Sequence, residues 1–273
     1  MSMQVYIDAV GVIGPGAGDW AAWRTILLDG AAYQAEKTVV PTLNVLPGAE
    51  RRRVGSSVKI ALASGLEALA AAQLDPSGVT TVFSSSGGDG ENCHLICEAL
   101  AGDDRLISPT RFHNSVHNAP SGYWGIASGA MLPSTSLCAF DASFAAGLLE
   151  AAVQCSVGNI PVLLVVYDTP YPEPLNSARP MSDQFAVSLL LTPSATTRSL
   201  TGIGLKLDKT AASLMSNPEL EHVRLSIPAA RSLPLLHALA QMPDRSIGEN
   251  QPDVYIEYLN RQSLCVTFLP VKS

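Results

Sequence analysis

One stretch of the sequence combines a candidate nucleophile with local structure that could activate it. Residues 135–150 read Thr-Ser-Leu-Cys-Ala-Phe-Asp-Ala-Ser-Phe-Ala-Ala-Gly-Leu-Leu-Glu, a pattern that predicts a strand, a sharp turn and a helix. Such an elbow places a side chain in the field of the unpaired N–H groups at the helix N-terminus, which favours negative charge. For a cysteine, this field lowers the thiol pKa and generates the nucleophilic thiolate. Cys138 and Asp141 are therefore the first candidates for chemistry.

A second group of polar residues is denser. Residues 111–120 read Arg-Phe-His-Asn-Ser-Val-His-Asn-Ala-Pro. The two His–Asn pairs are spaced by four residues, so on a helix they share one face. This face predicts either a pocket or a set of buried side chains that satisfy core hydrogen bonds. The pocket candidates are Phe112, His113, Asn114, His117 and Asn118.

Three other motifs lack partners that ligand binding needs. On a helix, His94 points away from Cys93 and Cys97, and no second ligand pair completes a tetrahedral metal site. The glycines at 11, 14 and 16 follow a first strand, but their order is not G-x-G-x-x-G and no acidic residue follows at the required distance. The glycine-rich residues 87–90 lack the lysine of a phosphate-binding loop. We therefore expect no metal and no cofactor.

Composition limits the class of protein. The 273 residues carry a formal net charge of −7, and charged residues make up only 15%. An acidic chain without a basic patch is not expected to bind nucleic acid. The apolar runs are strand-sized, far short of the about 20 residues of a membrane span, and no signal-peptide pattern opens the chain. Five scattered cysteines favour a reduced, cytoplasmic location.

Hydrophobic patterning predicts an α/β fold in one domain, residues 1–273. The pattern is clear to Thr192 and weaker beyond it. Strands are predicted at 5–7, 79–83, 135–140, 161–167, 185–192, 254–258 and 264–269. Helices are predicted at 19–28 with a cap at Gly30, and at 57–73, 92–100, 141–157, 218–224 and 232–241. Residues 170–180, with four prolines, are predicted to be irregular. The arginines at 51–53 are interpreted as a solvated basic run at the start of a helix, with contact to an acidic carrier protein as the alternative.

The order and spacing of several motifs resemble the ketosynthase (β-ketoacyl-acyl-carrier-protein synthase) family of thiolase-fold condensing enzymes. The resemblance covers residues 5–192. In the first part of the chain, it includes the opening Val-Gly-Val-Ile-Gly-Pro-Gly, the alanine-rich helix predicted at 57–73, and Ser108-Pro109-Thr110. Further along, it includes the elbow, Glu150-Ala151 with Gly158, the apolar strand predicted at 161–167, and Ala178-Arg179-Pro180. It implies a thiolase-like fold that corresponds to the N-terminal half of a ketosynthase. Residues 193–273 would be a reduced remnant of the C-terminal half.

Two departures from this family bear on catalysis. Aligned on Gly158 and the helix before it, Asp141 stands where ketosynthases carry the nucleophilic cysteine. Using Cys138 instead would require three inserted residues and put the thiol inside the strand. The family's histidine motifs, His-Gly-Thr and Gly-Phe-Gly-Gly-His, are missing, and His222 and His237 lie in unrelated contexts. The donors that would stabilise an enolate are thus absent. We predict no catalytic residue, and expect Asp141 to serve as a helix N-cap.

A ketosynthase relative with these departures resembles the chain length factors that pair with true ketosynthases. The short form with Ser108 to Asn118 resembles the ketosynthase-like partner of bacterial aryl polyene pathways, which are related to fatty-acid and type II polyketide synthesis. The resemblance implies a heterodimer with a full-length β-ketoacyl-ACP synthase, contact with an acyl carrier protein, and a role in shaping the polyene tunnel. It also implies that the strand before the elbow pairs across the dimer axis, through Thr135, Ser136, Leu137, Cys138, Ala139 and Phe140.

Two alternatives stay open at the level of sequence. The chain could be a compact acyltransferase or condensing enzyme that uses Cys138 as nucleophile with His113 or His117 as base. It could also be a purely structural dimerisation module without substrate contact. Acyl chain length and the identity of the carrier protein are not encoded in any recognisable motif.

Overall fold

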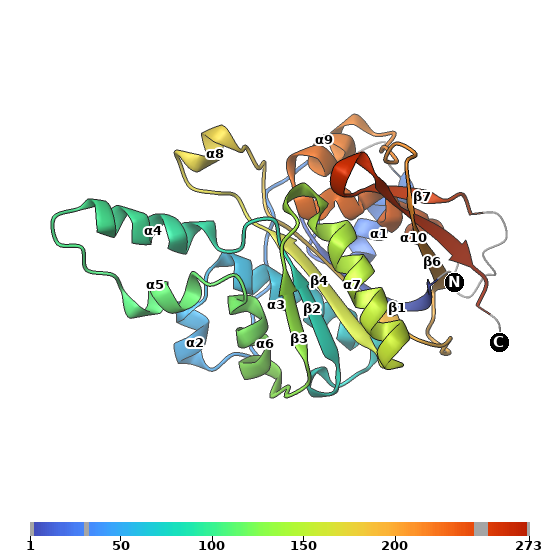
Figure 1. The fold of residues 1–273 in the computed structure, drawn as a ribbon, viewed down its shortest axis with the longest axis horizontal. Helices are drawn as coiled ribbons and strands as arrows, with labels where there is room; N and C mark the ends of the chain where they lie inside the picture. Colours follow the sequence, from blue (N-terminus) through green and yellow to red (C-terminus); the bar gives the residue numbers. More distant parts are fainter. Residues whose placement is uncertain (1–2, 30–32, 243–250, 272–273) are drawn as a thin grey trace.

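The computed structural model describes residues 3–29, 33–242 and 251–271. Within these ranges one eight-stranded sheet has the order β3-β2-β4-β5-β1-β6-β8-β7 (Figure 1). β2 runs parallel to β3 and β4, and the other neighbouring pairs are antiparallel. The strands are β1 (Met3–Ile13), β2 (Thr80–Ser84), β3 (Ser134–Leu137), β4 (Val162–Asp168), β5 (Phe185–Thr192), β6 (Thr201–Asp208), β7 (Val254–Glu257) and β8 (Ser263–Leu269).

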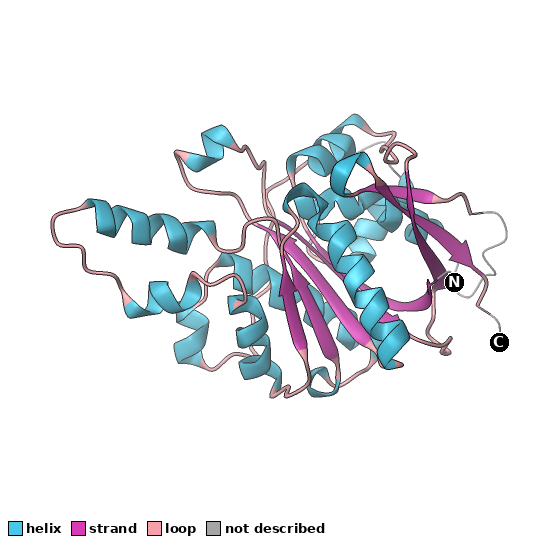
Figure 2. Cartoon of the chain, viewed as in Figure 1, coloured by secondary structure: helices cyan, strands magenta, loops and turns pink. Residues whose placement is uncertain are grey.

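Helices cover both faces of this sheet (Figure 2). One face packs against α3 (Ser56–Ala72) and α6 (Ala119–Ser128), and the other against α1 (Trp20–Asp29), α7 (Ser143–Gly158) and α10 (Leu233–Gln241). β4 shows why both faces are apolar. Its side chains alternate, so that Val162, Leu164 and Val166 join the core under α7 while Leu163 and Val165 join the core under α3. The predicted α/β class is confirmed.

Gly11 lies inside β1, which corrects the prediction that it follows the first strand in a glycine-rich turn. β1 continues through Gly11 to Ile13, and Gly16 has the positive φ of 87° that a turn glycine adopts. α3 crosses β1 so closely that a Cβ on Gly11 would collide with the carbonyl oxygen of Ser64 and lie 3.0 Å from the Ala68 nitrogen. Glycine is therefore required here for packing. The expected cap at Gly30 lies outside the described residues.

β5 has the predicted bounds, and the other predicted elements are present with shifted ends. The missed strand is β6, and the missed α-helices are α2 (Gly48–Arg53), α5 (Pro109–Asn114), α6 and α8 (Leu175–Ala178). The arginine run at 51–53 ends α2 rather than starting a helix. The proline-rich segment contains one short helix, α8 (Leu175–Ala178). Beyond Thr192, β6, β8 and β7 extend the sheet, while α9 (Pro218–Ser226) and η3 (Pro228–Ser232) lie beside α10 on the α7 face.

Two features of this architecture stand out at the β3 side of the molecule. β3 is the first strand of the sheet, so one of its edges has no neighbouring strand in the part of the chain that the structure describes. α4 (Gly90–Ala101) and α5 extend away from the body as an arm, and α4 contains no buried residue (Figure 1). We call residues 90–114 the arm from here on. An unpaired strand edge and a protruding arm are surfaces that a second chain could cover.

Candidate functional site

The predicted elbow exists, but its strand is shorter than expected. β3 ends at Leu137, and Cys138 and Ala139 precede a 3₁₀ turn, η2 (Phe140–Ala142), that leads into α7. Phe140 has a φ of 54°, a left-handed conformation that is unusual for an aromatic residue. Ser143 fixes this turn: its hydroxyl accepts from Ala139 N at 3.0 Å and donates to Phe140 O at 2.7 Å. The chain reverses sharply because these local bonds hold it.

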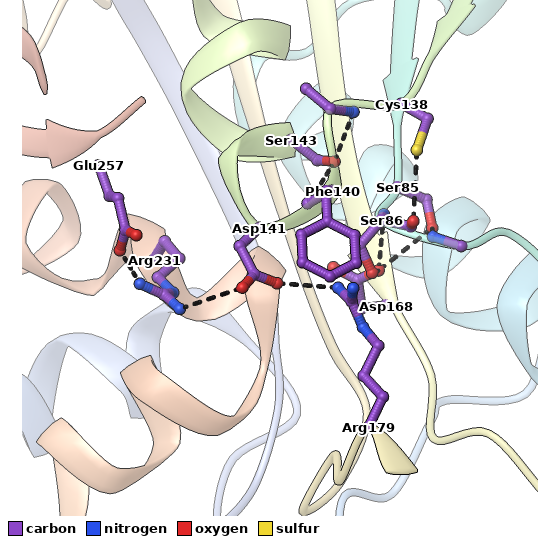
Figure 3. A network of polar contacts seen from close by, with 12 residues as sticks. Ser85, Ser86, Cys138, Phe140, Asp141, Ser143, Asp168, Arg179, Arg231 and Glu257 are labelled. Atoms are coloured by element: carbon purple, nitrogen blue, oxygen red, sulfur yellow. Dashed lines mark hydrogen bonds and ion pairs between the residues drawn. The ribbon is translucent and has the colours of Figure 1, made fainter. Parts of the chain in front are cut away.

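Asp141 is not a helix cap, which corrects the prediction made from its position. α7 has Ala142 at its N-cap and no side-chain cap bond. The Asp141 carboxylate instead accepts from Arg179 at 2.8 Å and lies 3.7 Å from Arg231, which also contacts Glu257 (Figure 3). The Arg179 guanidinium carbon also lies 3.4 Å from the centre of the Phe140 ring. The position that should hold a nucleophile therefore holds a carboxylate between two guanidinium groups.

Cys138 lies beside the elbow rather than in the strand. Its side chain is exposed, and the thiol donates to the Ser86 carbonyl at 3.2 Å (Figure 3). A nucleophilic thiol needs a neighbouring base or positive charge to form the thiolate. Among the interactions of the described residues, none joins a histidine to this sulfur. The carbonyl that this thiol contacts is neither a base nor a positive charge.

The His–Asn pairs do not share a helix face, because α5 ends at Asn114 and α6 begins at Ala119. The side chains divide into two groups. Asn114 is buried, where it accepts from the Tyr123 hydroxyl at 2.9 Å and donates to the Arg53 carbonyl at 2.8 Å. His117 contacts the Ser85 carbonyl through Nε2 at 3.2 Å. Because a carbonyl only accepts, Nε2 of His117 carries the proton.

The other candidates line an open groove of about 360 Å³ on the outer side of α6. Phe112 and His113 come from α5, and Asn118 precedes α6. His113 packs edge-on against Tyr123, with ring centres 6.2 Å apart. The groove is mostly apolar and includes Val116 and Ile126 in its lining. Its chemistry suits an apolar chain better than a polar substrate.

The sequence reasoning missed Asp168, which lies behind the elbow at the end of β4. Its Oδ1 accepts from Ser86 N at 2.8 Å, from Ser86 Oγ at 2.7 Å and from Ser85 Oγ at 3.2 Å. Burial raises the pKa of Asp168 to about 6, although these hydrogen bonds and one from the Ala229 amide act in the opposite direction. An acidic residue that ends an all-apolar strand was the available signal.

Apolar side chains gather on the elements beside the free edge of β3. Met131 is 94% exposed in the loop before β3, and Val157 is 82% exposed on α7. Ile126 on α6, Leu132 in the loop before β3, and Val153 on α7 are also exposed. Exposed apolar residues along an unpaired strand edge are typical of a surface that another protein covers.

The mixed sheet, the elbow and the α7 crossover define the thiolase-like class of condensing-enzyme folds. Within that class, a family model described as the N-terminal domain of beta-ketoacyl synthase matches residues 20–248, and the chain belongs to this family. The predicted resemblance and the predicted thiolase-like fold are confirmed. A search of curated proteins finds no match. None of the helices in the described ranges is long and apolar enough to cross a membrane.

Solved structures with the same fold include complexes of ketosynthases with chain length factors. The complex of the ketosynthase ApeO with its chain length factor ApeC from Xenorhabdus doucetiae contains a chain that is 25% identical, with a TM-score of 0.72 over 97% of this chain and 99% of that chain. Two further structures, at 14% and 13% identity, show the fold alone. They are the AntDE:AntF complex of a type II PKS acyl-carrier protein with its ketosynthase (TM-score 0.76, covering 99% and 100%) and the ishigamide ketosynthase/chain length factor (TM-score 0.72, covering 99% and 100%).

The ion pairs of Asp141 lead to a stability prediction that distinguishes them from a cap. Asp141→Asn and Asp141→Ala should both lower the free energy of unfolding by about 1–2 kcal/mol, because either leaves Arg179 and Arg231 without the anion between them. This loss of stability should be smaller in 1 M salt, because salt screens the interaction between the charges. Urea titration with and without salt measures the free energy of unfolding. Asp75→Asn is the control, since Asp75 does cap a turn through Ser77 N and asparagine caps comparably. An asparagine at 141 as stable as wild type would restore the cap interpretation.

Proposed function

We propose that this chain is a non-catalytic chain length factor that pairs with a full-length β-ketoacyl-ACP synthase and shapes its acyl tunnel in aryl polyene or type II polyketide-like synthesis. The carrying observation is the elbow, where Asp141 is held between Arg179 and Arg231. A carboxylate bound in this way is a poor nucleophile, because its lone pairs are engaged by donors. The elbow geometry is retained while the chemistry of acyl transfer is lost.

The proposed pairing is supported by the surface around β3. The free edge offers backbone groups, and the exposed apolar residues beside it offer burial. Gln154 of α7 donates to the Thr135 hydroxyl at 2.9 Å, which ties the helix to this edge. An obligate complex would bury well over ~2,000 Å² here. The likeness at 25% identity to a chain of the ApeO–ApeC complex supports the same arrangement.

Docking of an acyl carrier protein, as part of this proposal, is supported by the arginines that end α2. Arg51, Arg52 and Arg53 are all exposed. Asn114 donates to the Arg53 carbonyl, which ties α5, with its exposed Arg111, to the end of α2. Exposed guanidinium groups on two joined helices suit an acidic protein surface. Carrier-dependent synthesis also places the chain in the cytoplasm within this proposal.

The test combines co-expression with a labelling experiment. The chain should co-purify with the full-length ketosynthase of the same source as a heterodimer, and the ketosynthase should elongate acyl carrier thioesters only in its presence. Intact mass after incubation with the acyl or malonyl thioester should show no adduct on this chain. A stoichiometric adduct that disappears in Cys138→Ala would instead establish the acyltransferase alternative. A stable dimer without effect on elongation would establish the structural module.

Within this proposal, Phe112 should influence product length. It lies on the groove beside α6 and is exposed in the isolated chain, so substitutions should cost little stability. Phe112→Ala should shift the product distribution toward longer chains and Phe112→Trp toward shorter ones, measured by mass spectrometry of released products. Leu106→Ala, on an equally exposed part of the arm outside the groove, is the control. Identical distributions for all three variants would exclude Phe112 from the tunnel.

A further inference from the structure

The loop that follows β2 connects three parts of the candidate site. We call residues 85–89 the serine–glycine loop. Its Ser86 carbonyl accepts from Cys138 at the elbow, and its Ser85 carbonyl accepts from His117 between α5 and α6. At its end, Asp89 caps α4 by accepting from Asn92 N at 3.0 Å, which starts the arm. A shift of this loop would therefore move the arm relative to the elbow.

A single carboxylate holds the loop from beneath. Asp168 Oδ1 takes two hydrogen bonds from Ser86 and one from Ser85. The Ser85 hydroxyl in turn accepts from Gly88 N at 3.0 Å, and Gly88 has the positive φ of 64° that turns the chain into α4. The bonds form one chain from the sheet through the loop to the root of the arm. Figure 3 shows the part that joins Asp168 to Ser85 and Ser86. Asp168 is only 2% exposed, so water does not substitute for it.

We propose that Asp168 is a positioning residue, which sets the orientation of the arm through the serine–glycine loop and thereby the product length of the complex. The second half of this inference rests on the proposed function, while the first half concerns the chain by itself. Asp168 does not line the groove, and no hydrogen bond or ion pair given for the described residues joins it to an elbow side chain. Its hydrogen bonds from Ser85 and Ser86 link it to both through the serine–glycine loop.

The charge of Asp168 makes this anchor sensitive to pH, and the sign follows from linkage. Burial raises the pKa of Asp168 to about 6 from an ordinary value of 3.8. If opening of the loop hydrates the carboxylate, the closed loop binds the proton more tightly, so closure is favoured at low pH and weakened as pH rises through about 6. The titratable groups on the elements around Asp168 are Tyr167 on β4, Asp89 before α4, His117, Cys138 and Arg231 in η3.

The experiment compares Asp168 with a matched buried carboxylate. Asp8 on β1 accepts from the hydroxyls of Thr192, Thr196 and Ser199, and Thr192 ends β5 at the opposite end of the sheet from Asp168. Hydrogen exchange of the peptides covering residues 85–95 is measured on the full chain for wild type, Asp168→Ala, Asp168→Asn, Ser85→Ala and Asp8→Ala. Product lengths are then measured for the same variants in the complex.

Asp168→Ala should raise exchange in residues 85–95 at least tenfold and shift product length, because three loop donors lose their acceptor. Asp168→Asn, which keeps an acceptor oxygen, should preserve both. After correction for intrinsic rates, exchange in wild type should be about tenfold slower at pH 5 than at pH 7.5, and independent of pH in Asp168→Asn. Asp8→Ala should lower thermal stability without either effect.

The two halves of the inference fail separately. If Asp168→Ala and Ser85→Ala change loop exchange no more than Asp8→Ala does, Asp168 does not position the loop. If loop exchange responds but product length does not, the link to product length is wrong. Should Asp168→Ala fail to fold, Ser85→Ala and the pH profile of Asp168→Asn carry the same decision. If wild type does not alter products at all, the proposed function fails while the exchange data still decide the role of Asp168.

Discussion

Ser136→Pro should leave the chain folded and abolish co-purification with the ketosynthase that we propose as its partner. The carbonyl of Pro133, just before β3, accepts from Thr81 of β2, and that of Leu137 accepts from Ser85, just after β2. By alternation, Ser136 therefore turns its backbone groups to the free edge. Proline is tolerated where the N–H faces outward from an edge strand, yet it removes the donor that a partner strand would use. Together with the clash of its ring, this should cost the interface about 3 kcal/mol or more, about 100-fold in Kd.

Leu137→Lys is a less clean variant of the same experiment, because Leu137 also packs against the core of the chain itself. Leu207→Lys serves as the control, since Leu207 is an exposed strand residue in β6, on the other side of the sheet. Pull-down and size analysis measure pairing, and circular dichroism measures folding. Normal pairing of a folded Ser136→Pro chain would place the interface elsewhere.

Gly11→Ala should be among the most destabilising single substitutions in the chain. Its methyl group would overlap the Ser64 carbonyl oxygen of α3, and neither the strand nor the helix backbone can move without disturbing the core on that face. Overpacking against side chains costs about 1–3 kcal/mol, and a backbone obstacle should place this variant at about 3 kcal/mol or above. Thermal or urea unfolding measures the loss.

Gly122→Ala provides the matched control for Gly11. Gly122 lies inside α6, and a Cβ there meets nothing within 4 Å. Alanine should raise stability by about 0.5–1 kcal/mol, since it lowers the conformational entropy of the unfolded helix segment. Equal effects at positions 11 and 122 would contradict the close approach of α3 to β1.

The sequence predicted the elements whose pattern is local, and it failed for elements that depend on contacts with segments distant in the sequence. β4, β5 and α7 were found because long apolar runs and an alanine-rich helix need no information about neighbours. β6 was missed because Gly202, Gly204 and Lys206 interrupt its pattern, although pairing with β1 and β8 makes the strand.

The site shows the same limit more sharply. Asp141 has the residue type and the position of an N-cap, and nothing near it in the sequence indicates its ion pairs with Arg179 and Arg231. The His–Asn spacing fits a continuous helix, but one helix ends at Asn114 and the next begins at Ala119. Asp168 was overlooked because a single acid at a strand end is common, and its role depends on the serines that a parallel neighbour strand brings to it.

Under the proposed function, the charge network at the elbow makes the loss of a nucleophile hard to reverse in evolution. Asp141 is balanced by arginines from two distant parts of the chain, and one of them is shared with Glu257. A mutation from aspartate to cysteine would leave the partly buried positive charges of Arg179 and Arg231 without this anion before it restored any activity. In that case, a lineage that regained catalysis would have to change the arginines as well and pass through less stable intermediates, whereas changes in the proposed tunnel residues meet no such barrier. Under the proposed function, descendants of this chain should therefore diversify in product length while remaining dependent on a partner for chemistry.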